Sequence, residues 1–127
     1  MSFRAIERCE GPFDVKEDTY DSNLYYVGVA KGAPYAYCHV QTFEEFAYVH
    51  LKVIRFSHET LRTMLGDFTM LKDLLARCGV KCLVGYRKAE EAPDLWFKFI
   101  RLAGFSKAEA VKVGDIFYQR VYLKLEV

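Results

Sequence analysis

Residues 57–79 read SHETLRTMLGDFTMLKDLLARCG, and this stretch decides the fold. Apolar side chains recur in it at steps of three and four residues, which places them on one face of a helix. They are Leu61, Met64, Leu65, Phe68, Leu71, Leu75 and Cys78. Ser57 is a typical N-cap, Glu59 suits the positive end of the helix dipole, and Gly79 suits a C-cap. The pattern predicts one long helix over about residues 58–78.

Strand-like segments precede this helix, beginning with a short edge strand in SFRAIER (2–8). Three longer segments follow, in which tyrosine, valine and phenylalanine suit a half-buried pleated surface. They are NLYYVGVAKG (23–32), PYAYCHVQTF (34–43) and EFAYVHLKVIRF (45–56). Short connections at Gly32-Ala33-Pro34 and Glu44-Glu45 favour hairpins. The three segments therefore predict an antiparallel meander.

The apolar segment VKCLVGY (80–86) follows the helix and predicts a buried strand. A strand, a helix and a strand in succession imply a parallel pair joined by a right-handed crossover, so the sheet is mixed. A second helix starts at Pro93-Asp94 and ends at Gly104, with four side chains directed inward: Leu95, Trp96, Phe99 and Leu102. Gly114-Asp115 then marks a closing hairpin. We expect one α+β domain over residues 1–127, in which the meander leads into β-α-β-α-β-β.

The composition excludes several classes of protein. Apolar residues make up 52% of the chain and aromatic residues 16%, which excludes a disordered chain. Eighteen basic residues against seventeen acidic ones leave no general field that would attract nucleic acid or a membrane surface. The N-terminal MSFRAIERCE lacks the apolar core of a signal peptide, so we expect a soluble cytoplasmic protein.

The positions of the cysteines and tyrosines lead to two further expectations, one about metal binding and one about protein contacts. The four cysteines fit buried small hydrophobes better than a metal site, since only one pair has ligand-like spacing: Cys9, Cys38, Cys78 and Cys82. Six tyrosines gather in and next to the meander: Tyr20, Tyr25, Tyr26, Tyr35, Tyr37 and Tyr48. They favour either a contact of this sheet with a protein partner or a second copy, or an internal aromatic core.

The order of elements, together with FIRLAGF (99–105), resembles the GNAT superfamily of acyl-CoA-dependent N-acyltransferases over about residues 24–126. YYVGVAKGAPYAYCHV (25–40) is similar to the second and third strands of that family, and LARCGVKCLVGY (75–86) to the passage from its long helix into the fifth strand. The resemblance implies a GNAT-like fold. Its first two helices are reduced or absent, since only CEGPFDVKEDTYDS (9–22) is available for them.

Two motifs of the family are missing. The family binds the coenzyme diphosphate with a glycine loop at the start of the long helix, but the only glycine in RFSHETLRTMLGDF (55–68) is Gly66, well inside the predicted helix. The family also often carries a tyrosine that protonates the leaving thiolate, and Ile100 occupies that position. We therefore expect no cofactor, and acetyl-CoA only if the chain has remained an enzyme.

A weaker resemblance links the chain to internal-virion and head-assembly proteins of tailed phages that resemble degenerate members of this superfamily. The shared features are the compact length, the long helix without a glycine loop, and an aromatic-rich helix without the tyrosine. This resemblance implies protein–protein contacts in virion assembly, with the virion as a second location besides the cytoplasm.

Candidate catalytic residues follow from the alternative of acyl transfer. His50 and Glu45 are candidate general bases, and Tyr86 is the candidate proton donor if it points into the cleft. His39 and His50 become cross-strand neighbours if Glu44-Glu45 is a two-residue turn, whereas a register change of one residue separates them. The alternative is a pair of half-exposed histidines on a sheet.

Candidate cofactor-binding residues lie near the end of the third meander strand. The resemblance places the coenzyme in a splay between the strand ending near Val53 and the strand starting near Val80, with backbone groups of Leu51 to Val53 holding its pantetheine arm. Ser57 and His58 stand at the helix start, where free N–H groups hold an anion unless they are simply capped. No metal site is expected.

Two functions stay open. The first is a non-catalytic or degenerate GNAT-like protein that acts through protein contacts, and the missing motifs favour it. The second is a divergent N-acetyltransferase that acts on an amine. In the first case Trp96, Phe99 and Ile100 are expected to fill the space that an enzyme leaves for the thioester.

Overall fold

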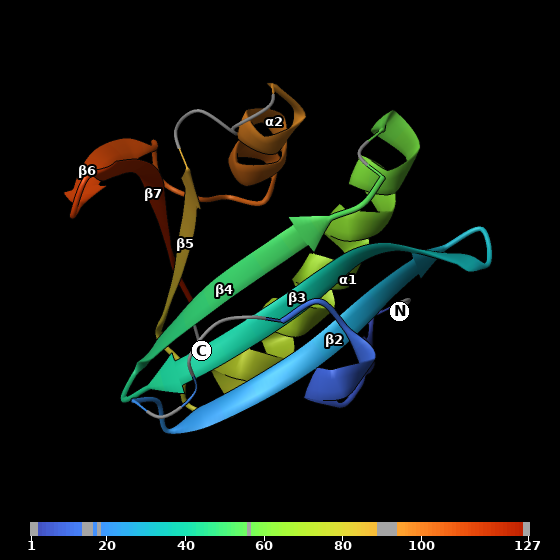
Figure 1. Ribbon diagram of the computed structural model, residues 1–127, viewed down its shortest axis with the longest axis horizontal. Coiled ribbons are helices and arrows are strands. Elements are labelled where there is room, and N and C mark those ends of the chain that lie inside the picture. Colours follow the sequence, from blue (N-terminus) through green and yellow to red (C-terminus); the bar gives the residue numbers. More distant parts are fainter. Residues whose placement is uncertain (1–2, 14–16, 18, 56, 89–93, 126–127) are drawn as a thin grey trace.

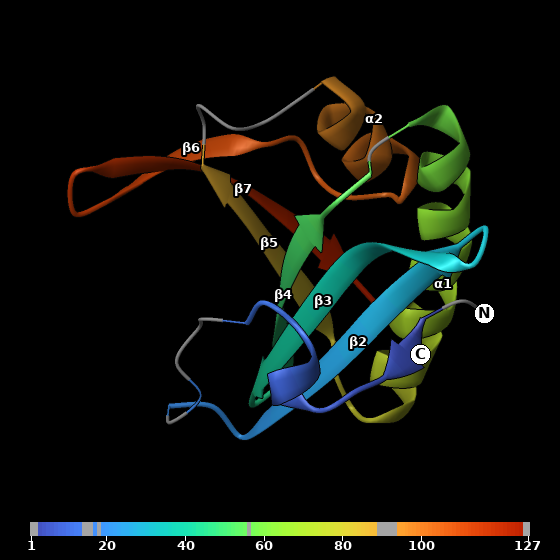
Figure 2. The same cartoon turned by 45° about the vertical axis from the view of Figure 1, so that its right-hand side comes forward.

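The computed structural model describes residues 3–13, 17, 19–55, 57–88 and 94–125. Within them, seven strands form one mixed sheet in the order β1-β2-β3-β4-β5-β7-β6, with helix α1 across one face (Figures 1 and 2). The elements are β1 Arg4–Ala5, the 3-10 helix η1 Arg8–Glu10, β2 Ser22–Ala30, β3 Ala33–Phe43, β4 Phe46–Val53, α1 His58–Arg77, β5 Cys82–Lys88, α2 Asp94–Leu102, β6 Glu109–Val113 and β7 Ile116–Lys124. The predicted α+β class and order of elements are confirmed.

Helix α1 is the long amphipathic helix that the sequence predicts. Ser57 is its N-cap, and Gly79 adopts φ +92° just beyond its last turn. Its apolar stripe is buried against the sheet: Leu61, Met64, Phe68, Leu71 and Leu75. Leu65 packs at the edge of this core. Each buried side chain of this kind contributes roughly 1.5–3 kcal/mol, so the stripe anchors the helix to the sheet.

The meander β2–β3–β4 is antiparallel throughout, as predicted. Its second turn is Glu44-Glu45, since Phe43 pairs with Phe46. Its first turn differs from the prediction: Ala30 pairs with Ala33, so the turn is Lys31-Gly32 and not Gly32-Ala33-Pro34. Both turn residues have positive φ, 54° and 75°, which is the backbone of a tight two-residue hairpin turn whose twist matches the strands.

Strands β4 and β5 are parallel but paired over only part of their length. The pairing runs from Phe46–Cys82 to Val49–Gly85. Beyond it, β4 continues to Val53 and β5 to Lys88, and the two strands diverge (Figures 1 and 2). The predicted splay between these strands is therefore present.

Helix α2 packs beside α1 through an apolar face at positions i, i+3, i+4 and i+7, made of Trp96, Phe99, Ile100 and Ala103. Leu102 was predicted to point inward but is 53% exposed, because it lies more than a quarter turn away from this face. The side chain of Leu95, also predicted inward, lies outside the described residues.

The end of α2 has the predicted glycine cap. Gly104 adopts φ +93°, and the Phe105 N–H donates to the Ile100 carbonyl over 2.9 Å. The Phe105 ring then folds back onto Phe68 of α1, with 5.4 Å between ring centroids.

The face of the sheet opposite α1 carries no long helix in the described residues. Between Phe3 and Asp21 the described part holds one 3-10 helix, so the first two helices of the family are reduced as expected. The N-terminal segment crosses this face (Figure 2), where the Phe13 ring packs against Tyr25 and Tyr37.

Burial corrects part of the cysteine prediction. Cys38 is fully buried and Cys82 partly so, but Cys9 and Cys78 are exposed, because each lies at or beside the end of a helix. Neither described helix is long and apolar enough to cross a membrane.

Candidate functional site

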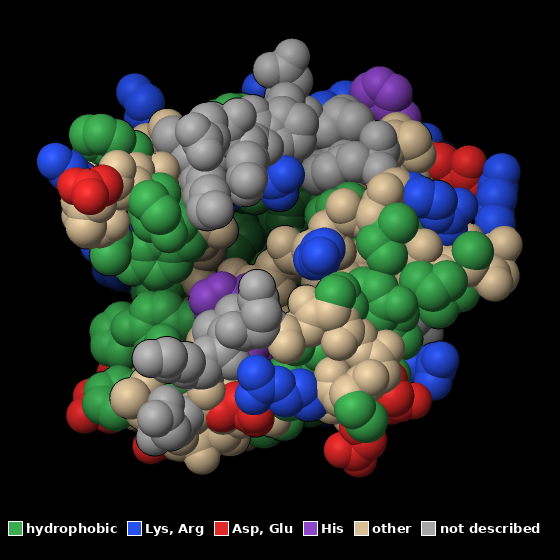
Figure 3. All heavy atoms as spheres, viewed as in Figure 1, with side chains coloured by type: hydrophobic (Ala, Val, Ile, Leu, Met, Phe, Trp, Pro, Cys, Tyr) green, Lys and Arg blue, Asp and Glu red, His purple; other side chains and the backbone are tan. Residues whose placement is uncertain are grey.

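A cleft opens where β4 and β5 diverge. It has a volume of about 930 Å³ and begins just beyond the last strand pair, Val49–Gly85. Figure 3 shows this hollow in the middle of the face opposite α1, with hydrophobic side chains at its floor and basic side chains at its rim. Beyond the Val49–Gly85 pair the two strands share no ladder pairs, which leaves the gap that the cleft occupies.

The inner wall of the cleft is apolar. It is formed by the contact between α1 and α2, where the rings of Phe68 and Phe99 meet edge to face at 5.5 Å. Trp96 and Ile100 add to this wall, and both are 6% exposed. These α2 side chains were expected to fill the space of the thioester; they line the cleft, and that role stays a prediction. Ile100 presents only carbon to the cleft.

A hydrogen-bonded row of polar side chains borders the cleft through His39 and His50. His39 on β3 pairs directly with His50 on β4, so the predicted cross-strand register is confirmed. The His50 Nε2 lies 2.8 Å from Gln41 Oε1, and the His39 Nε2 lies 2.9 Å from Asn23 Oδ1. His39 is only 1% exposed, which corrects the alternative of two half-exposed histidines.

Burial shifts the titration of this row. The Tyr25 ring stacks on His39 at 4.4 Å, and desolvation lowers the pKa of the imidazole. Desolvation also raises the pKa of the Tyr25 hydroxyl to about 12. His39 and Tyr25 are therefore both uncharged near neutral pH.

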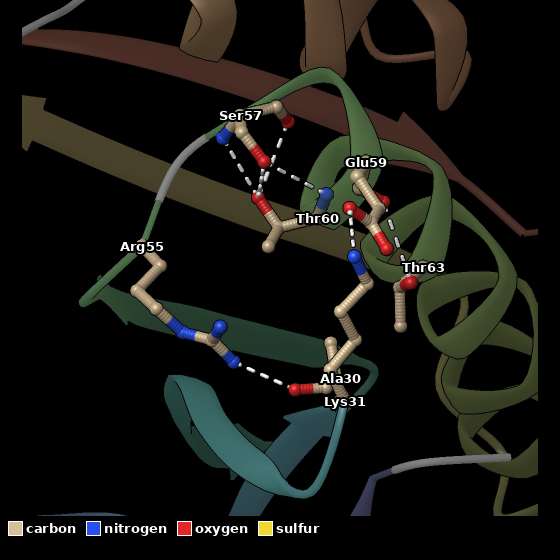
Figure 4. Close-up of polar contacts among 7 residues, drawn as sticks. All are labelled: Ala30, Lys31, Arg55, Ser57, Glu59, Thr60 and Thr63. Carbon is tan, nitrogen blue, oxygen red and sulfur yellow. Dashed lines mark hydrogen bonds and ion pairs between the residues drawn. The ribbon is translucent and has the colours of Figure 1, made fainter.

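The start of α1, where an anion would bind, is capped by the chain itself (Figure 4). The Thr60 N–H donates to Ser57 Oγ over 3.2 Å, and the Ser57 N–H donates to Thr60 Oγ1 over 2.8 Å. Glu59 brings a carboxylate into the first turn and forms an ion pair with Lys31 at 3.1 Å. Of the two readings of Ser57, simple capping is therefore the one the geometry supports.

The guanidinium of Arg55, just before this helix, donates hydrogen bonds to the β2–β3 hairpin. Its Nη2 donates to the carbonyls of Ala30 and Ala33 over 2.7 and 2.9 Å, and its Nε to that of Pro34 over 3.3 Å (Figure 4 draws the contact with Ala30). The guanidinium therefore ties the hairpin to the start of α1. A diphosphate would have to compete with these three carbonyls for the cation.

The structure separates the predicted site residues into two groups. Four line the cleft: His50, Leu51, Val53 and Tyr86. Ser57 and His58 stand at the helix start, and Glu45 lies in the exposed β3–β4 turn beside Lys81, at the opposite end of β4 from the splay. The catalytic and cofactor-binding roles of all seven stay predictions.

Sequence reasoning missed the polar residues that support the site. Gln41 is fully buried and Asn23 partly so, and a period-two pattern marks only that they share a face with His39. It also missed the buried Asp67 of α1, which accepts a hydrogen bond from the Tyr35 hydroxyl over 2.7 Å. Among the described residues, no three His, Cys, Asp or Glu side chains gather closely enough to hold a metal ion.

Comparison with solved structures shows a GNAT-like fold. The ribosomal-protein-S18-alanine N-acetyltransferase of Escherichia coli matches with a TM-score of 0.69 and 16% identity, over 98% of this chain and 94% of that one. An aminoglycoside acetyltransferase in complex with coenzyme A matches with a TM-score of 0.63 and 13% identity, over 82% and 67%. An aminoglycoside 6'-acetyltransferase of type Ii gives 0.63 and 11%, over 84% and 72%.

These likenesses are in fold, at low sequence identity. No protein-family model matches the chain, and a comparison with curated proteins found no match either.

Proposed function

We propose that this GNAT-like chain does not carry out acyl transfer and acts through contacts with another protein. Virion assembly is the setting that we propose, and the resemblance of the sequence to internal-virion proteins of tailed phages supports it. The fold is GNAT-like, but several residues of the site differ from what acyl-CoA binding requires, and these differences support the proposal.

The closed start of α1 is the observation that carries the proposal. Backbone N–H groups of Ser57 and Thr60 already bond side-chain oxygens, so a bound diphosphate would have to displace them. Glu59 places a carboxylate in the first turn, and although it is paired with Lys31, it would weaken the attraction of this helix end for a phosphate. The residues present here therefore do not fit the diphosphate of coenzyme A.

The residue at the position of the family's tyrosine supports the same conclusion. Ile100 is buried in the apolar wall and has no proton to give to a thiolate. Tyr86 also lines the cleft, but from β5, with its ring edge-on to Tyr118 at 6.3 Å.

The tyrosines available to a partner are fewer than the sequence suggests. Tyr25, Tyr26 and Tyr35 are buried within the chain, which leaves Tyr20 and Tyr48 partly exposed beside each other at 5.8 Å, and Tyr37 nearby on the same face. We propose these three as the tyrosine contribution to a contact with a partner or a second copy. Sedimentation velocity over a wide concentration range tests self-association, and substituting Tyr20 and Tyr48 by serine should weaken any association seen.

Titration calorimetry with acetyl-CoA tests the loss of acyl transfer. We expect no saturable heat, and no release of free coenzyme A in a thiol assay with a panel of amines. The Ile100→Tyr variant should stay equally inactive, because a proton donor is of no use where the diphosphate is not held. Turnover of acetyl-CoA by the unmodified chain above the buffer rate would overturn the proposal.

A divergent N-acetyltransferase is the second candidate, and the open cleft favours it. His50, Leu51 and Val53 all border the opening that acetyl-CoA would use, and Gln41 orients the His50 ring. Under this candidate His50 acts as the base toward an amine, and acetyl-CoA supplies the acyl group. It predicts turnover that His50→Phe abolishes and that Glu45→Gln leaves unchanged.

A further inference from the structure

The row of polar side chains in the cleft determines which atoms carry protons. The Asn23 Nδ2 donates to the Glu17 carbonyl over 3.2 Å, so Oδ1 is the accepting end of that amide. It accepts from Gln41 Nε2 over 3.2 Å and lies 2.9 Å from His39 Nε2. Because an amide oxygen has no hydrogen to give, His39 carries its proton on Nε2.

The same reasoning extends to the second histidine. Gln41 uses its Nε2 as a donor, so its Oε1 is an acceptor, and the His50 Nε2 at 2.8 Å must be the donor. Both histidines therefore carry a proton on Nε2. In His39, whose pKa burial lowers, Nδ1 carries the lone pair.

The Nδ1 of His39 is enclosed and has no hydrogen-bond partner among the residues that the structure describes. An acceptor buried without a partner costs free energy, and such atoms are rare in folded proteins. Yet His39 is among the residues that line the cleft, while Tyr25 stacks on its ring at 4.4 Å and Phe13 packs edge-on at 6.0 Å. Its pKa is lowered by burial, so the ring stays uncharged and Nδ1 stays an acceptor near neutral pH.

We propose that the cleft binds a planar, uncharged group bearing a single N–H or O–H, and that a small shift of the rings packed on His39 lets this hydrogen be donated to Nδ1. Such a group is an indole or a phenol, either as a free aromatic compound or as a tryptophan or tyrosine side chain of a protein partner. The inference does not depend on whether coenzyme A binds.

The lining of the cleft accounts for each part of this description. Nine aromatic side chains border it: Phe13, Tyr20, Tyr37, Phe68, Tyr86, Trp96, Phe99, Phe105 and Tyr118. They suit a flat apolar body, which stacks on them or meets them edge to face. Apart from the histidines, the charged side chains among the described lining residues are Lys52 and Arg87, both cationic, which disfavours a charged amine. The lone pair on Nδ1 disfavours an anionic atom at that one position.

A matched pair of probes, indole and 1-methylindole, tests the donor. The two have nearly the same shape, but only indole has an N–H. We expect indole to bind the unmodified protein roughly three- to tenfold more tightly, as one buried hydrogen bond contributes. In ¹⁵N spectra of the imidazoles, indole should shift the His39 Nδ1 resonance, and 1-methylindole should leave it nearly unchanged. Equal affinities for indole and 1-methylindole, or a His39 Nδ1 resonance that does not shift when indole is added, would overturn the proposal.

Two histidine variants test whether His39 is the source of the preference for indole. His39→Phe keeps a flat ring and removes the acceptor, so the preference for indole should disappear. His58→Phe changes an exposed histidine at the start of α1, which does not line the cleft, and should keep the preference in full. A preference that survives in His39→Phe would refute the assignment to this residue. If that variant does not fold, the probe pair and the imidazole spectra of the unmodified protein still decide.

The peptide Gly-Trp-Gly separates the two sources of the ligand. If a partner's side chain is the natural occupant, the peptide should bind at least as tightly as indole, since its backbone adds contacts at the rim. If the occupant is a free aromatic compound, the peptide should bind more weakly than indole. Both results support the donor chemistry, whereas binding of neither probe contradicts it.

Discussion

Gly104 shows how one residue without a side chain ends a helix. Its φ of +93° is a conformation that L side chains rarely adopt, and it lets the Phe105 N–H reach back to the Ile100 carbonyl. The space around it is not the constraint, because an added Cβ would meet Leu123 at an ordinary 3.6 Å. Glycine is required here because the backbone has a positive φ, and not because space is lacking for a side chain.

Gly104→Ala should therefore destabilise the protein by about 1–2 kcal/mol, the cost of holding an L residue in the left-handed region. Chemical denaturation measures this change. Gly66→Ala is the matched control, because Gly66 is exposed within α1 with open space around it, and alanine there should stabilise by about 0.5–1 kcal/mol. Equal effects of the two substitutions would contradict the backbone argument.

His39 should make stability depend on pH. Burial lowers the pKa of His39 in the folded state below the ordinary 6.5. Just below that pH the unfolded chain therefore binds a proton at this histidine that the folded chain does not bind. The stabilisation is complete above about pH 6.5 and is lost as the pH falls through the window below it. Melting temperatures measured across this range should fall with acidification, and less steeply in His39→Phe.

The carboxylate of Glu17 makes stability depend on pH in a separate, more acidic range. Its pKa is lowered from 4.5 by the neighbouring Tyr25 hydroxyl and by Arg8, so it contributes only at more acidic pH. A pH dependence in His39→Phe equal to that of the parent between about pH 5 and 6.5 would show that His39 is not its source.

Among the elements, α1 depends on its own first turn as well as on its buried stripe. The reciprocal bonds between Ser57 and Thr60 satisfy N–H groups that have no partner within the helix. Lys31 and Arg55 tie the same turn to the β2–β3 hairpin, so the helix start is a junction of three segments (Figure 4).

Ser57→Ala should cost about 1 kcal/mol, since the side-chain acceptor for the Thr60 N–H disappears. Thr63→Ala is the control in the next turn. The Thr63 hydroxyl only bonds a carbonyl within the helix, to Glu59 over 3.4 Å, and alanine has the higher helix propensity. We expect that control to be neutral or slightly stabilising in denaturation, and a comparable loss in both variants would count against the capping argument.

For the whole molecule, stability should be distributed unevenly over the sheet. β3 lies between β2 and β4 and carries a continuous buried stretch, whereas β6 is an edge strand that is mostly exposed. The β6–β7 end also exposes Val113, Ile116 and Phe117. Local opening requires the loss of few contacts there.

Hydrogen exchange should therefore be slowest for the amides of β3 and fastest for those of β6. Exchange mass spectrometry on dilute protein measures the order. β6 amides that exchange as slowly as those of β3 would contradict the prediction, and protection that appears only at high concentration would reveal association through this edge.

Prediction from sequence succeeded where the signal is local. The apolar spacing of Leu61, Phe68 and Leu75 predicted α1, and the GNAT-like arrangement followed from the order of elements. It failed where neighbouring elements decide, as for Leu102, which an apolar pattern places inward but the packing of α2 leaves exposed. The Lys31-Gly32 turn was displaced for a similar reason, since strand register sets the turn position.

The sequence by itself determined the helices, most of the strands and the absence of a glycine loop, because backbone preference and hydrophobic period act between residues close in the chain. Only the tertiary structure decided that His39, Gln41 and His50 share a hydrogen-bonded row with Asn23 beside an open cleft. That row depends on strand register and on where β4 and β5 part, which residues far apart in sequence set together. No local pattern carries such information, because the partners of a buried polar atom are chosen by packing.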